Sequence, residues 1–135
     1  MSKRYSFEFF PPKTEVGRDK LKQTRTELNA LDPDFFSVTY GAGGSTRDNT
    51  RGIVLETLAA GIDVAPHLSF GGDEEAEVLS LIEQYREAGV RRIVALRGDI
   101  PSGMGATRLI YARELVEFIR KHTGDHFELE VAAYP

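Results

Sequence analysis

Side chains capable of chemistry lie at or near the ends of four apolar runs in this sequence. A glutamate stands among aromatic residues in 5–12, hydroxyl groups and glycines close 35–41, and a lone histidine lies in 64–68. The fourth run, 94–99, ends in a cation, a glycine and a carboxylate. Ligands of parallel α/β proteins bind at the carboxyl ends of the strands. The four runs therefore predict one shared pocket.

Glu8 is the first candidate for acid–base chemistry. Side chains alternate between the two faces of a strand, so the aromatic residues at 5, 7, 9 and 10 fall on both faces of this one. We therefore expect a strand that is buried on both faces, as is typical of a parallel sheet. Burial beside aromatic rings favours the protonated form of a carboxyl group, as a general acid requires. The alternative interpretation is a structural ion pair with an arginine or a lysine.

The other candidate side chains also have plainer interpretations. Asp99 either binds a ligand or pairs with Arg97, and His67 is either a ligand contact or a hydrogen-bonded core residue. Thr39 alone would be a residue of high strand propensity. The glycine-rich segment 41–45 either binds an anion through backbone N–H groups or forms a flexible turn. No second histidine or carboxylate lies at metal-ligand spacing, so we predict no metal site.

The composition indicates a soluble, cytoplasmic protein. The 135 residues suit one domain, with a net charge of −4 and no cysteine. An acidic chain lacks the basic surface that nucleic acids and anionic membranes attract, so we expect neither as a partner. The absence of cysteine excludes disulfides, thiolate zinc sites and a cysteine nucleophile. The apolar runs are also much shorter than the ~20 residues that cross a membrane.

Strand-like and helical segments alternate along the chain, which predicts an α/β fold with a parallel sheet. Strands are predicted near 5–11, 34–40, 62–70, 91–98 and 127–134. The first helix is predicted over about 14–31 with Thr14 as its N-cap, and Gly61, Gly89 and Gly124 end the next three. The pattern fits either an open doubly wound sheet or part of a barrel.

Five ordered motifs resemble those of the methylenetetrahydrofolate reductase family. In chain order they are SFEFFPP at 6–12, SVTYGA at 37–42, APHL at 65–68, ALRGDIP at 95–101 and AAYP at 132–135. The resemblance runs over essentially the whole chain. It implies that residues 1–135 form a single domain, the N-terminal portion of a (βα)8 TIM barrel. About the first four βα units and the fifth strand would be present.

The resemblance also implies an activity. FAD would be bound noncovalently, NADH or NADPH would reduce it, and 5,10-methylenetetrahydrofolate would become 5-methyltetrahydrofolate. Glu8 matches the family's acid that protonates an amine nitrogen of the substrate, and Asp99 matches the carboxylate that stabilises the cationic iminium. The positions that match flavin or nicotinamide contacts are Thr39, Tyr40, Ala42, His67, Arg97, Gly98, Asp99, Tyr111, Ala112, Ala132 and Tyr134.

Two other functions stay open from the sequence. One is a flavin-independent barrel enzyme of pterin or one-carbon chemistry, and the other is a non-catalytic α/β module that binds a nucleotide or a pterin. A complete barrel takes ~250 residues, so the first and fifth strands of this segment would lack neighbours. Exposed edge strands seek partners. We therefore expect a homo-oligomer, and no reductase activity from these 135 residues alone.

Overall fold

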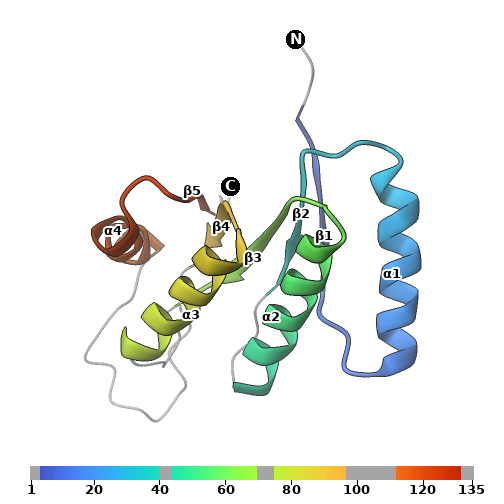
Figure 1. The fold of residues 1–135 in the computed structure, drawn as a ribbon, viewed down its shortest axis with the longest axis horizontal. Coiled ribbons are helices and arrows are strands. Elements are labelled where there is room, and N and C mark those ends of the chain that lie inside the picture. Colours follow the sequence, from blue (N-terminus) through green and yellow to red (C-terminus); the bar gives the residue numbers. More distant parts are fainter. Residues whose placement is uncertain (1–3, 40–43, 70–74, 97–111, 132–135) are drawn as a thin grey trace. The chain divides into compact units, whose positions relative to one another are not determined.

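The structure, a computed structural model, describes residues 4–39, 44–69, 75–96 and 112–131 (Figure 1). Five parallel strands are hydrogen-bonded in the order β1-β2-β3-β4-β5, and a helix follows each of the first four. This confirms the predicted α/β class and agrees with part of a TIM barrel. The elements are β1 (Ser6–Phe9), α1 (Glu15–Asn29), β2 (Phe35–Val38), α2 (Gly44–Ala59), β3 (Val64–Leu68), α3 (Glu75–Ala88), β4 (Arg92–Ala95), α4 (Ala112–Thr123) and β5 (Glu128–Val131).

The chain divides into two compact units, Met1–Pro66 and His67–Pro135, and the boundary falls inside β3. The first three residues of β3 pair with β2, and its last two pair with β4. Each unit therefore has its own strand pairings and its own helices. Within the described residues, no helix is long and apolar enough to cross a membrane.

The first unit is built on an aromatic cluster on one face of β1 and β2. Phe7 pairs in register with Phe36, and the Phe9 ring stacks on Phe36 with centroids 5.2 Å apart. Phe36 is only 1% exposed, because the helices cover this face. The helices α1 and α2 lie side by side (Figure 1), and an ion pair of 3.0 Å joins Lys22 to Glu56.

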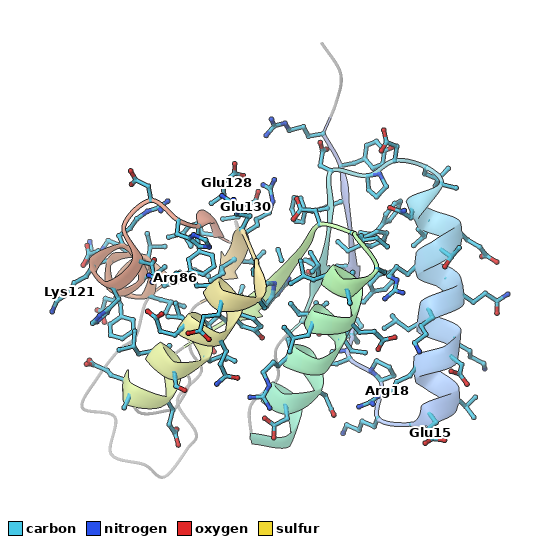
Figure 2. The ribbon with its side chains drawn as sticks, viewed as in Figure 1. Glu15, Arg18, Arg86, Lys121, Glu128 and Glu130 are labelled. Carbon is cyan, nitrogen blue, oxygen red and sulfur yellow. The ribbon has the colours of Figure 1, made fainter. Side chains whose placement is uncertain are left out.

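The second unit has an apolar face and an ionic face. Ile93 and Ala95 of β4 are fully buried on the apolar face. The ionic face carries Arg92, whose Nη1 lies 2.9 Å from carboxylate oxygens of both Glu128 and Glu130. Both glutamates belong to β5 and are labelled in Figure 2. Arg92 and Glu128 are register partners at the amino ends of their strands, so this cluster lies at the end opposite the predicted ligand site.

The helix ends follow the sequence prediction. The Thr14 Oγ1 accepts a hydrogen bond of 3.0 Å from the Gly17 N–H, which is the expected N-cap contact. Gly61 and Gly89 follow α2 and α3 with φ of 79° and 97°, a conformation that glycine adopts without steric cost. The first strand is shorter than predicted, Ser6–Phe9 in place of 5–11, and the predicted ends of the other four lie outside the described residues.

Candidate functional site

Glu8 and Thr39 lie on one face of the sheet at the carboxyl ends of β1 and β2. Glu8 pairs in register with Ser37, and register partners in parallel strands share a face. The Thr39 N–H donates to the Phe9 carbonyl at 2.9 Å, so the pairing continues beyond the last residue of β2. Thr39 stands two residues beyond Ser37 and therefore points to the same side. The structure brings these two candidates together in the first unit.

The predicted burial of Glu8 is wrong. Glu8 and Ser6 are exposed, while Phe7 and Phe9 on the opposite face are half-buried in the aromatic cluster. The aromatic side chains therefore cover one face of β1 and not both. Phe10, which we expected to bury the Glu8 face, is itself 77% exposed. Within the described residues, Glu8 thus lies on the face of β1 opposite the aromatic cluster.

Thr50 is a residue of this region that the sequence analysis missed. It lies in α2 and is 0% exposed, and its Oγ1 donates to the Thr39 carbonyl at 2.8 Å. Thr39 is thus bonded through its N–H to β1 and through its carbonyl to α2. Sequence gives no signal for such a contact, because a threonine inside a helix most often bonds its own helix. Two backbone bonds hold Thr39 in a fixed orientation.

In the second unit, His67 is the candidate that the structure describes most fully. It is 8% exposed, and its register partner is Val94 on β4. The Leu96 N–H donates to the Leu68 carbonyl at 2.8 Å, so the β3–β4 pairing reaches the residue before Arg97. Ala112 is half-buried at the first position of α4. A buried imidazole at a strand end suits a specific hydrogen bond to a ligand, or to the protein itself.

Several predicted residues lie outside the part of the chain that the structure describes. They are Tyr40, Ala42, Arg97, Gly98, Asp99, Tyr111, Ala132 and Tyr134. Among the residues that are described, no group of three or more histidine, aspartate or glutamate side chains could hold a metal ion.

The described groups support acid–base chemistry and ligand binding. A carboxyl group near a strand end can deliver a proton to a bound ligand, provided that the ligand nitrogen or oxygen comes within hydrogen-bonding reach. The neighbouring Thr39 hydroxyl can both donate and accept a hydrogen bond. Such a pair suits a small polar ligand that is bound at the carboxyl ends of β1 and β2.

Comparison with known proteins gives a consistent result. The family model for methylenetetrahydrofolate reductase matches residues 1–135. The 5,10-methylenetetrahydrofolate reductases of Pectobacterium carotovorum subsp. carotovorum and Escherichia coli (strain K12) are 42% and 41% identical over 131 residues. These alignments cover 96% of this chain and 43% of each relative.

A plant relative is more distant and longer. The probable methylenetetrahydrofolate reductase (NADH) of Oryza sativa subsp. japonica is 35% identical over 138 residues, which are 97% of this chain and 23% of that protein. The chain thus spans less than half the length of these curated relatives. The match of the family model along the whole chain and the identity of about 40% to the bacterial enzymes show that this chain belongs to the methylenetetrahydrofolate reductase family.

Proposed function

We propose that this protein reduces 5,10-methylenetetrahydrofolate to 5-methyltetrahydrofolate, with FAD as bound cofactor and NADH or NADPH as reductant. The observation that carries the proposal is that Glu8 and Thr39 share one face at the carboxyl ends of β1 and β2, in a chain that the family model matches throughout. The printed name of the rice relative specifies NADH, which supports a nicotinamide as the electron source. The proposal concerns the whole protein, because the relatives are more than twice as long as this chain.

The described residues fit the binding of FAD. A flavin is a planar ring edged with hydrogen-bonding atoms, and it requires donors that are already oriented. Thr39 meets this requirement because two backbone bonds fix it, and His67 contributes a buried imidazole. FAD supplies the hydride chemistry that no side chain offers. We propose the same binding role for Tyr40, Ala42, Arg97, Gly98, Asp99, Tyr111, Ala112, Ala132 and Tyr134.

Glu8 is proposed as the acid of the folate reaction. Its carboxyl group would protonate an amine nitrogen of the substrate, which opens the five-membered ring and leaves a cationic iminium. The position of Glu8 near the carboxyl end of β1, where ligands of parallel α/β proteins bind, supports this role. Asp99 is proposed to stabilise the iminium, because a carboxylate near a developing positive charge lowers the barrier to its formation. We also propose that the protein is cytoplasmic and forms a homo-oligomer.

The substitution Glu8→Gln tests this assignment in the natural full-length protein. Reduction of the flavin by NADH or NADPH should be nearly unchanged, since that step needs no acid. Oxidation of the reduced flavin by methylenetetrahydrofolate should be slower by about 10²–10⁴-fold, the usual cost of losing a general acid. Rapid-mixing absorbance at flavin wavelengths measures the two half-reactions separately. Equal slowing of both would show that Glu8 is structural.

A control variant tests whether the loss of one carboxylate elsewhere in the protein has the same effect. Glu27→Gln makes the same chemical change on the exposed surface of α1 and should leave both half-reactions intact.

The purified protein should also be yellow and contain FAD in roughly equimolar amount. A colourless protein that FAD does not stabilise against heat would refute the reductase proposal. It would favour a flavin-independent pterin enzyme or a binding module.

A further inference from the structure

Thr50 makes a hydrogen bond that has no role in the reaction proposed above. Its hydroxyl donates from α2 to the carbonyl of Thr39, 11 residues earlier in the chain, at 2.8 Å. The threonines Thr57 and Thr123 behave in the usual way, since each donates at 2.7 Å to the carbonyl four residues earlier in its own helix. Thr50 differs from them because its hydroxyl donates to a residue at a strand end.

This bond completes the attachment of Thr39. The Thr39 N–H already donates to the Phe9 carbonyl at 2.9 Å, which ties the residue to β1. The bond from Thr50 fixes the other side, the carbonyl group. Fixing both peptide groups of a residue restricts its φ and ψ angles, and the allowed side-chain rotamers depend on those angles. The direction of the Thr39 hydroxyl therefore depends on α2 as well as on β1.

Burial makes the bond hard to replace. Thr50 is 0% exposed, so no solvent reaches its side chain to take over the hydroxyl's role. Thr39 is itself half-buried, so its carbonyl, on losing this donor, must stay unpaired or move to find another partner. Movement of the carbonyl would carry Thr39 with it. Loss of the Thr50 hydroxyl is therefore expected to disturb the strand end and not only the helix.

We propose that Thr50 is a positioning residue for FAD binding, which acts through Thr39 and touches no ligand itself. The inference rests on the proposed function, because FAD is assigned to Thr39 there. It extends the binding site from the strand ends into the buried side of α2. It also predicts that a change away from the ligand will alter both the affinity for the flavin and the environment of its ring.

Two valine substitutions in α2 of the natural full-length protein test the proposal. Thr50→Val removes the hydroxyl and keeps the shape of the side chain. Thr57→Val is the matched control, because Thr57 is also buried in α2, at 2% exposure, and its hydroxyl bonds Ile53 and Arg25 but not Thr39. Titration of each apoprotein with FAD gives the dissociation constant, and thermal unfolding of the apoprotein gives the stability.

Thr50→Val should raise the dissociation constant for FAD by about tenfold, which corresponds to about 1.4 kcal/mol. It should also change the visible circular dichroism of the flavin at saturating FAD. Thr57→Val should lower the melting temperature without either effect. Thr50→Ser keeps the hydroxyl and should restore the affinity of the unmodified protein to within about threefold, since only a methyl group is lost.

The possible results separate the two proposals. Equal weakening of FAD binding by Thr50→Val and Thr57→Val would show that Thr50 acts only on stability and would overturn the inference. An unchanged dissociation constant in Thr50→Val would do the same while leaving the reductase proposal intact. Absence of FAD binding in the unmodified protein would overturn both. If Thr50→Val does not fold, Thr50→Ala and Thr57→Ala provide the same comparison.

Discussion

Replacement of glycine by alanine should have opposite effects on stability in α1 and in α2. Gly17 lies in the first turn of α1, and a Cβ atom there would stand 2.9 Å from the Cβ of Pro12 and 3.0 Å from the Oγ1 of Thr14. Gly52 lies in α2, where an added Cβ would meet nothing within 4 Å. Real Cβ atoms do not approach another carbon to 2.9 Å, so the turn after β1 must shift in Gly17→Ala.

The size of each effect follows from these contacts. Alanine is favoured over glycine in a helix by about 1 kcal/mol, so Gly52→Ala should stabilise by about that amount. Gly17→Ala has the same gain in helix propensity, but it presses the added methyl group against the rigid ring of Pro12, which costs about 1–3 kcal/mol. It also displaces the Thr14 cap oxygen, whose bond to the Gly17 N–H contributes about 1 kcal/mol. The net loss should be about 1–3 kcal/mol.

Urea unfolding of the two variants measures the difference, which should be about 2–4 kcal/mol between them. Pro12→Gly removes the nearer clashing atom, so Gly17→Ala should be less harmful in that background. The coupling energy of the double-mutant cycle isolates the contact from the other effects of the proline change. If both alanine variants shift stability in the same direction by similar amounts, the steric argument is refuted.

Three further expectations concern the ion cluster, the proposed iminium partner and the sheet edges. Arg92→Met should destabilise the protein by about 1–2 kcal/mol, since it leaves Glu128 and Glu130 adjacent without their shared cation. It should not change the affinity for FAD, and an unchanged melting temperature would contradict the expected loss of stability. Asp99→Asn should slow folate reduction. It should also raise the reduction potential of the flavin, because loss of a nearby negative charge favours the reduced flavin, and potentiometry measures the direction of that shift. These 135 residues alone should self-associate without reductase activity, because β1 and β5 are the edge strands of the sheet in the described part of the chain and Val131 is 55% exposed. A sedimenting monomer that turns over substrate would refute this.

Helix positions were predictable from the sequence because their signals are local. Thr14 is the N-cap of α1, and Gly61 and Gly89 follow the ends of α2 and α3, as expected. A cap depends on residues a few positions apart, so sequence spacing contains the information. The prediction failed at Leu31, which was placed inside the first helix but lies beyond its end at 57% exposure. Asp32 with its φ of 56° belongs to the turn that stops this helix.

Strand lengths and burial were less predictable because they depend on partners distant in sequence. The apolar run 5–11 suggested a strand of seven residues, yet β1 has only four, Ser6–Phe9. The Glu8 face was expected to be buried, but Phe7 and Phe9 pack against Phe36 on the opposite face of the sheet. The buried Arg25, which donates to Thr57 at 3.1 Å, has no sequence signature either. Side-chain partners across elements are set by the packing of α1 against α2.

The strand order β1-β2-β3-β4-β5 also bears on how the chain is made. Each strand pairs with the one synthesised just before it, so no strand of the described segment waits for a later one to find a neighbour. The unit Met1–Pro66 is complete in sequence before the second unit leaves the ribosome. Domains generally fold from the amino terminus during synthesis, at about 5–20 residues per second. The sheet can thus grow at one edge as translation proceeds, and the backbone groups of that edge stay unpaired until the next strand is made.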